Sequence, residues 1–170
     1  MSKIWKPEDA HQREPTAVPN VAKGPRYGVV DTTFSTVDMG AIAVSTLREI
    51  GLAPNRIVRR TVPGFKDLAV AAKQMIERDQ CAIVLACGMP GPEPIDKQCG
   101  HEASLAIGQA QLMTSTHILE VFVHMDEART DAELVQIATN RVAGHAINAY
   151  WLLERPQELV SRAGTGQRQG

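Results

Sequence analysis

Apolar and polar residues follow two alternating patterns from about Tyr27 to the end of the chain. Short, almost uninterrupted apolar runs are typical of strands that are buried on both faces of a parallel sheet. Each run is followed by a longer stretch in which apolar residues recur every three or four positions, the spacing of a helix with one face on a core. The strands predicted in this way are Tyr27–Asp31, Arg56–Val62, Ala82–Gly88 and Ile118–Val123.

Local signals mark the ends of the helices between these strands. Gly51 stands where the first helix ends, because glycine readily adopts the left-handed conformation that closes many helices. Thr130 and Glu133 have the spacing of a capping box, in which each side chain bonds the backbone amide of the other residue. Pro156 prevents the last helix from continuing. The predicted helices are Asp38–Ile50, Lys66–Arg78, one from about Asp96 to Met113 after a Pro-rich loop that begins at Met89, and Thr130–Leu153.

Four consecutive strand–helix units predict an α/β fold, a single three-layer domain in which a four-stranded parallel sheet carries helices on both faces. A length of 170 residues fits one domain. We expect this domain to span residues 24–170, after a polar and flexible N-terminal tail over residues 1–23. Residues 163–170 are rich in glycine and polar side chains, which predicts a flexible end.

Charge and composition argue against several classes of protein. Lys and Arg number 18 against 19 Asp and Glu, so the chain lacks the positive charge that nucleic-acid binding requires. No apolar run is long enough to span a bilayer, and the tail has no apolar signal region. We therefore expect a cytoplasmic protein with neither a nucleic acid nor a membrane as partner. The three cysteines, Cys81, Cys87 and Cys99, form no Cys-x-x-Cys pair, which favours free thiols over disulfides or a zinc site.

Ligands of open parallel sheets bind beyond the carboxyl ends of the strands, where loops and helix N-termini converge. All three phenylalanines of the chain, Phe34, Phe65 and Phe122, fall at or near this edge. Together they favour a flat ligand that stacks on them, although any one of them could equally fill the rim of the core. A nucleotide is disfavoured, because the chain has neither a Gly-x-Gly-x-x-Gly nor a P-loop motif.

His101 is the first candidate for acid–base chemistry at this edge. Near the start of the predicted third helix, the helix dipole favours a neutral imidazole, which can accept or donate a proton. A histidine that only caps or packs is an equal alternative, and His124, at the end of the fourth strand, is the second candidate. Asp96, Cys99, His101 and Glu102 together resemble no common closed metal centre, so a metal site built by the protein is a minor alternative.

Several motifs in sequence order resemble the archaeal-type riboflavin synthases. The match runs from about Tyr27 to the C-terminus, which is most of the chain, and the residues of the N-terminal tail lie outside it. This family is similar to the lumazine synthases, so the resemblance implies a lumazine synthase/flavodoxin-like fold and a homopentamer. The motifs are Asp31–Phe34, Val37–Met39, Thr61–Gly64, Gly88–Gly91, His101–Ser104, Ala110–Thr114, Glu120–His124 and Arg168–Gly170.

The resemblance implies a dismutation of two molecules of 6,7-dimethyl-8-ribityllumazine, bound together in one site. One lumazine donates a four-carbon unit to the other, and the products are riboflavin and 5-amino-6-(D-ribitylamino)uracil. This chemistry needs no organic cofactor. The family is associated with a divalent cation such as Mg²⁺, for which these residues indicate no site.

The protein's part in such a reaction is to orient two flat rings and to move protons. We expect His101 to be the principal proton carrier, assisted by Glu102 or Asp67. Phe122 to Met125 are expected to reach the site of a neighbouring subunit, as in the related pentamers. The residues expected to bind substrate are Asp31, Thr32, Thr33, Phe34, Pro63, Gly64, Phe65, Lys66, Gly88, Met89, Pro90, Phe122, Val123, His124 and Met125.

Two alternatives stay open on the same scaffold. A 6,7-dimethyl-8-ribityllumazine synthase needs a cationic phosphate site near the fourth strand, where this chain has acidic residues ahead of a single arginine, Arg129. A non-catalytic flavin or lumazine carrier would bind riboflavin without forming it.

Overall fold

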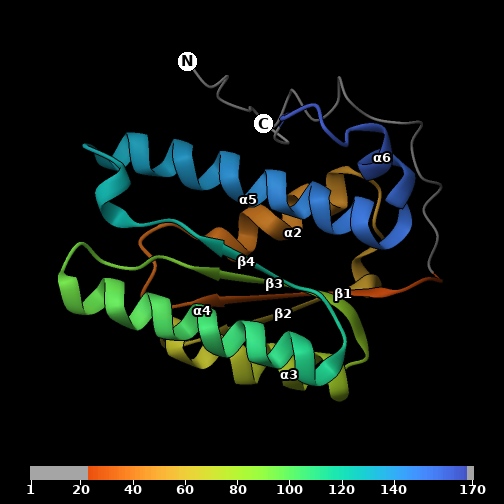
Figure 1. Cartoon of the computed structure of the whole chain (residues 1–170), viewed down its shortest axis with the longest axis horizontal. Helices are drawn as coiled ribbons and strands as arrows, with labels where there is room; N and C mark the ends of the chain where they lie inside the picture. Colours follow the sequence, from red (N-terminus) through yellow and green to blue (C-terminus); the bar gives the residue numbers. More distant parts are fainter. Residues whose placement is uncertain (1–22, 168–170) are drawn as a thin grey trace.

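A computed structural model describes residues 23–167 and contains one four-stranded parallel sheet (Figure 1). The tail predicted over residues 1–23 lies, apart from Lys23, outside the described residues, and so do the last three residues of the predicted flexible end. The strands lie in the order β2-β1-β3-β4. Their bounds are β1 Arg26–Thr32, β2 Ile57–Val62, β3 Cys81–Gly88 and β4 Ile118–Phe122.

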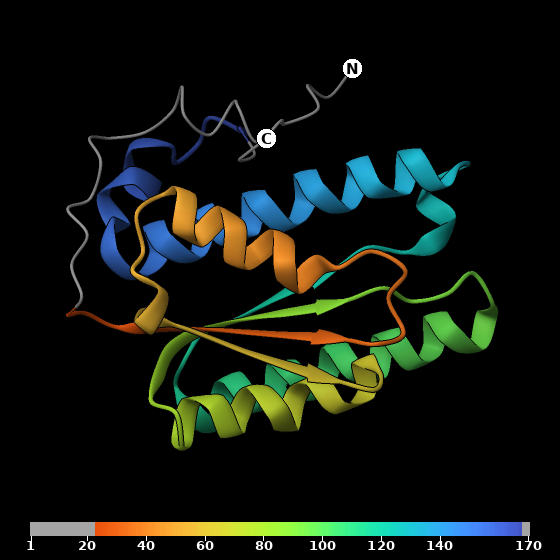
Figure 2. The ribbon, with the colours of Figure 1, turned by 180° about the vertical axis from the view of Figure 1, so that it is seen from behind.

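Helices cover both faces of this sheet (Figure 2). Helices α2 (Met39–Glu49) and α5 (Asp131–Glu154) pack on one face, and α3 (Leu68–Glu77) and α4 (Pro94–Thr114) pack on the other. The predicted three-layer α/β fold is therefore confirmed. A short helix that we did not predict, α6 (Pro156–Ser161), follows α5. Within residues 23–167, none of the helices has the combination of length and hydropathy that a bilayer crossing needs.

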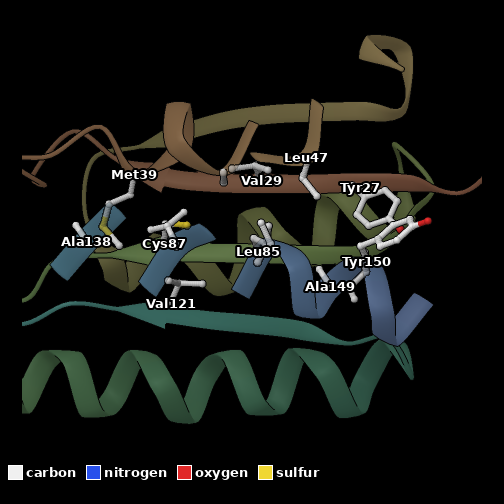
Figure 3. Close-up of a cluster of buried hydrophobic side chains, with 14 of the residues drawn as sticks. Tyr27, Val29, Met39, Leu47, Leu85, Cys87, Val121, Ala138, Ala149 and Tyr150 are labelled. Atoms are coloured by element: carbon white, nitrogen blue, oxygen red, sulfur yellow. The ribbon is translucent and has the colours of Figure 1, made fainter. Parts of the chain in front are cut away.

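Strand β3 lies inside the sheet because its residues are apolar on both faces. Alternate side chains of β3 point into two separate cores, with Leu85 and Cys87 in the core under α2 and α5, and Val84 and Ala86 in the core over α3 and α4. Each fully buried aliphatic side chain contributes about 1.5–3 kcal/mol to folding. Figure 3 shows the first core, in which Val29, Leu85, Cys87 and Val121 of the strands meet Met39, Leu47, Ala138 and Ala149 of the helices.

The helix ends follow local capping bonds, with two differences from the sequence prediction. Helix α4 begins at Pro94, because proline has the φ angle of a helix and its missing N–H is not needed in the first turn. At α5, Thr130 accepts a bond from the Glu133 amide at 3.1 Å as expected. The second bond of the predicted capping box, from the Thr130 amide to the Glu133 carboxylate, is wrong. This carboxylate accepts from the amide of Arg129 at 2.8 Å instead.

Two short 3-10 turns also move predicted boundaries. Pro54–Arg56 forms a turn, so β2 begins one residue later than predicted. Phe65–Asp67 forms another, so α3 begins at Leu68 rather than at Lys66. The second turn matters for the site, because it places three of its predicted residues between β2 and α3.

A buried ion pair joins the N-terminal end of the sheet to the end of α5. Arg56 is 3% exposed and donates to Glu154 at 2.5 Å. The Tyr27 hydroxyl donates to the same carboxylate oxygen at 2.6 Å. Burial and this bond raise the pKa of Tyr27 well above its usual value. This network lies at the pole opposite to the predicted site, so it serves stability.

Candidate active site

The loops that follow β1 and β3 diverge from one another at the carboxyl edge of the sheet. The chain leaves β1 toward α2 on one face and leaves β3 toward α4 on the other face. This is the switch point at which open parallel sheets bind their ligands. The β1–α2 loop (residues 33–37) touches the β3–α4 loop (residues 89–93) here, since the Thr36 hydroxyl contacts the Met89 sulfur at 3.4 Å.

The three phenylalanines form a row of ring contacts along this edge. Phe65 lies in the middle, with ring centroids 6.2 Å from Phe34 in an edge-to-face contact and 6.2 Å from Phe122 in a tilted contact. Phe65 is buried, Phe122 is half-buried, and Phe34 is 49% exposed. Sequence reasoning left open whether each ring fills the core rim or meets a ligand. In this chain Phe65 fills the rim, and Phe34 presents ring surface to solvent.

Gly88 is required by the close approach of two of these rings. A Cβ atom at Gly88 would lie 2.8 Å from a ring carbon of Phe122 and 3.2 Å from the Cβ of Phe65. At Gly64, by contrast, a Cβ would meet no atom within 4 Å. The space beside Gly64, next to exposed Pro63, is therefore open to a ligand.

Backbone bonds fix the start of the β1–α2 loop against the end of β2. The amide of Thr33 donates to Val62 at 2.9 Å, and the amide of Phe34 donates to Pro63 at 3.3 Å. The Thr33 hydroxyl also donates to Pro63, at 3.2 Å. The Thr32 hydroxyl lies 2.8 Å from that of Ser35. Both threonine hydroxyls, which we expected to bond substrate, thus have partners within the chain.

His101 lies two turns inside α4, since this helix begins at Pro94. Our expectation that His101 lies close enough to the helix start to feel its dipole is wrong, because that effect falls off within the first turn. The imidazole is exposed, which leaves it accessible for proton transfer.

Glu102, the neighbour of His101, forms an ion pair with Lys66 of the turn before α3. Gln98 donates to its other oxygen at 3.4 Å. The Lys66 hydrogen bond lowers the pKa of Glu102, and the same bond raises the pKa of Lys66. Glu102 is therefore a carboxylate near neutral pH and serves as a charge partner rather than as an acid. Asp67 is exposed at the end of the same turn, and its side chain does not cap α3.

The segment after β4 is bonded to the β3–α4 loop. The amide of Val123 donates to Gly88 at 3.1 Å, and that of Met125 donates to Pro90 at 3.0 Å. Val123 and Met89 are 0% exposed, so neither residue presents surface to a ligand in this structure. His124 is half-buried, and its amide donates to Glu127 at 2.8 Å.

The model of the 6,7-dimethyl-8-ribityllumazine synthase family matches residues 24–156. The chain belongs to this family. A protein named riboflavin synthase from Methanothermobacter thermautotrophicus is 52% identical over 145 residues, which cover 85% of this chain and 94% of that relative. Riboflavin synthases of Methanothermobacter marburgensis and Archaeoglobus fulgidus are 50% and 43% identical over the same shares. The resemblance drawn from the motifs is confirmed.

Two cations near the end of β4 in this member of the lumazine synthase family, Arg141 and Lys97, are already paired. Arg141 of α5 donates to both carboxylate oxygens of Glu127, at 2.7 and 2.5 Å, and to the carbonyl of Phe122 at 2.8 Å. This pairing lowers the pKa of Glu127. Lys97 of α4 pairs with Asp126. Neither Arg141 nor Lys97 is therefore free to bind the phosphate group that a 6,7-dimethyl-8-ribityllumazine synthase would need to hold.

The carboxylates at this edge do not fit a resident Mg²⁺ ion. Asp31, Glu102, Asp126 and Glu127 each accept bonds from a cationic side chain. Among the described residues, 23–167, no three His, Cys, Asp or Glu side chains gather as metal ligands do. We therefore derive no step through a metal.

Sequence reasoning assigned no role to three residues that hold the carboxylates and backbone at this edge, Arg59, Arg141 and Thr61, although Thr61 lies in the Thr61–Gly64 motif. Both oxygens of Asp31, which we expected to bind substrate, accept bonds from Arg59 at 2.5 Å and from Thr61 at 2.7 Å. The alternation of Arg59 and Thr61 along β2 was the available signal, because it places both on the same face of a strand. Arg141 lies in the middle of a long helix, and no local pattern marks it.

Proposed function

We propose that this chain is a riboflavin synthase that converts two molecules of 6,7-dimethyl-8-ribityllumazine into riboflavin and 5-amino-6-(D-ribitylamino)uracil. The observation that carries the proposal is the row of Phe34, Phe65 and Phe122 at the switch point of the sheet. The name of its relatives, at 43–52% identity, supports the same reaction. The atoms of the two substrates account for both products, so the reaction needs neither an oxidant nor a reductant.

In this proposal the exposed face of Phe34 supports one lumazine ring. Phe65 holds Phe34 from the side through the edge-to-face contact. The second ring lies against the first, near the open space beside Gly64. Fixing two reactants in this way can remove about 7–11 kcal/mol of the barrier through orientation alone. The substrate contacts expected of the other loop residues remain predictions, and those of Val123 and Met89 require a movement that exposes these two buried residues.

We propose His101 as the group that takes a proton from the 7-methyl carbon of one lumazine and returns protons in later steps. Its imidazole is exposed on α4, and its neighbour in the chain is Glu102, the carboxylate that pairs with Lys66. Asp67, exposed at the end of the neighbouring turn, is the second candidate to assist. No organic cofactor is required, and the divalent cation that the resemblance implies has no resident site among residues 23–167.

We further propose that the protein is a cytoplasmic homopentamer. Apolar side chains on the outer face of α4 support self-association, since Leu105, Leu112 and Met113 are 62%, 84% and 64% exposed. Exposed apolar patches of this kind mark interaction surfaces. In light scattering, Leu112→Lys is expected to shift the particle toward smaller species. An unaltered mass would remove α4 from the interface.

Incubation with 6,7-dimethyl-8-ribityllumazine as the sole substrate tests the proposed reaction. We expect riboflavin and the ribitylaminouracil in equal amounts. Parallel samples with a chelator test whether the reaction needs a divalent cation. The 6,7-dimethyl-8-ribityllumazine synthase alternative predicts no riboflavin here, and formation of lumazine from the ribitylaminouracil and a four-carbon phosphate. A carrier predicts riboflavin binding without any turnover.

A further inference from the structure

One arginine outside the predicted site contacts a carboxylate on each side of the β1–α2 loop (residues 33–37). The guanidinium of Arg59, on edge strand β2, donates from Nη2 to Asp31 and to Asp38, each at 2.5 Å. Asp31 lies near the end of β1, and Asp38 is the N-cap residue of α2. A single side chain therefore joins the point where the chain leaves the sheet to the point where it enters the next helix.

Each carboxylate of this bridge is also held by a second bond. Asp31 is 3% exposed, and its other oxygen accepts from the Thr61 hydroxyl at 2.7 Å. Asp38 accepts from the amide of Ala41 at 2.9 Å, which caps α2. A Cβ at Gly40 would lie 2.3 Å from an Asp31 oxygen and 2.6 Å from Arg59. The first turn of α2 is thus packed directly on the ion pair, and only glycine permits this approach.

The loop between these two carboxylates carries Phe34. Its first half is tied to β2 by the amides of Thr33 and Phe34. Its second half leads to Asp38, which the Arg59 guanidinium joins to Asp31 of β1. Because the Phe34 ring is half exposed and makes one edge contact with Phe65, its position depends on the path of the loop.

We propose that Arg59 is a positioning residue, which places the Phe34 ring for the lumazine by fixing both ends of the β1–α2 loop. The expected effect of Arg59 on turnover rests on the proposed function. Its expected effect on the loop rests only on the Asp31–Arg59–Asp38 bridge. Arg59 acts through Phe34 and takes no part in proton transfer.

The adjacent arginine of β2 provides a matched control. Arg60 forms an ion pair with Asp79 at 2.6 Å, and its side chain is 35% exposed against 34% for Arg59. It differs in what it holds, because Asp79 lies just before β3, at the opposite end of the sheet. Replacement of either arginine by methionine removes the same charge and retains most of the side-chain volume.

The test of coupling compares Arg59→Met and Arg60→Met in the unmodified chain and in a Phe34→Ala background. We expect Arg59→Met to lower kcat/KM about tenfold or more in the unmodified chain, because small misplacements in a site have effects of this size. In the Phe34→Ala background Arg59→Met should lower kcat/KM by less than about twofold, since the ring that Arg59 positions is absent. Arg60→Met should lower kcat/KM by less than about twofold in both the unmodified chain and the Phe34→Ala background. Equal losses from Arg59→Met in the two backgrounds would overturn the proposal.

A second measurement reads the loop without any substrate. Amide hydrogen exchange of Thr33 and Phe34 is expected to be about tenfold faster in Arg59→Met and unchanged in Arg60→Met. Unchanged exchange in Arg59→Met refutes the positioning role, whatever the activity. Faster exchange, together with an unmodified chain that leaves the lumazine unconverted, supports the positioning role and refutes only the proposed function.

If Arg59→Met does not fold, Asp38→Asn provides the same test. Asparagine caps helices as well as aspartate does, so this change removes one charge of the bridge and retains the cap. It is expected to speed the exchange of the same amides by a smaller factor, and no change would count against the bridge.

Discussion

Phe34→Ala removes the most exposed ring of the aromatic row and tests whether this ring binds substrate. Phe34 is 49% exposed, and an aromatic side chain can bury about 150–250 Å². A ligand that covers the exposed half would therefore bury roughly 75–125 Å² of the ring. At about 25 cal/mol per Å², this area contributes about 2–3 kcal/mol to binding. That free energy corresponds to about 30- to 150-fold in affinity.

The assay is equilibrium binding of riboflavin, followed by its own fluorescence, together with KM for the lumazine. The Kd for riboflavin and the KM for the lumazine should each rise by about 30- to 150-fold. The stability should fall by only about 0.5–1.5 kcal/mol, since the ring makes a single aromatic contact in the chain. Val70→Ala is the control, because Val70 is an apolar residue of α3 with 55% exposure, outside the predicted site. Binding within twofold of the unmodified protein in Phe34→Ala would refute the role of this ring.

Three further predictions concern packing and charge. Gly88→Ala should displace the Phe122 ring, since the new Cβ would lie 2.8 Å from it, and lower the urea-derived stability by about 1–3 kcal/mol. Glu154→Gln should lower the urea-derived stability by about 3–5 kcal/mol, because it leaves the buried Arg56 without its ion-pair partner. The control Glu77→Gln breaks the i,i+4 pair with Lys73 and should lower the stability by at most about 0.5 kcal/mol. Above about pH 10 the unfolded chain loses the Tyr27 proton while the folded chain, with its raised pKa, keeps it. Stability should then fall by about 1.4 kcal/mol per pH unit from this group, and the fall should be shallower in Tyr27→Phe.

The ion pairs at the carboxyl edge of the sheet differ in what they can contribute. Lys66 and Glu102 are both exposed, so water screens their attraction and the pair adds little to stability. Asp31 is buried, and removal of Arg59 leaves its carboxylate with only a hydroxyl donor. The buried pair therefore constrains the loop, whereas the exposed pair is free to separate when a ligand binds.

Local sequence pattern determined the secondary structure and the fold class. The central position of β3 follows from an apolar run that only a strand covered on both faces can bury. Single residues with strong backbone preferences set the ends of helices, as Thr130 does at α5. The edge of the sheet at which we propose the site also follows from sequence, because parallel strands bring their carboxyl ends together.

The tertiary structure decided how these side chains are paired. Whether Asp31 meets a ligand or an arginine depends on the register of β1 against β2, which the order of residues does not reveal. The position of His101 depended on where α4 begins, and a shift of a few residues removed the dipole argument. Arg141 reaches Phe122 and Glu127 from positions 19 and 14 residues further along the chain. Such contacts form only after the layers have packed, and for that reason the sequence predicted an edge of the sheet for the site but not the ion pairs formed there.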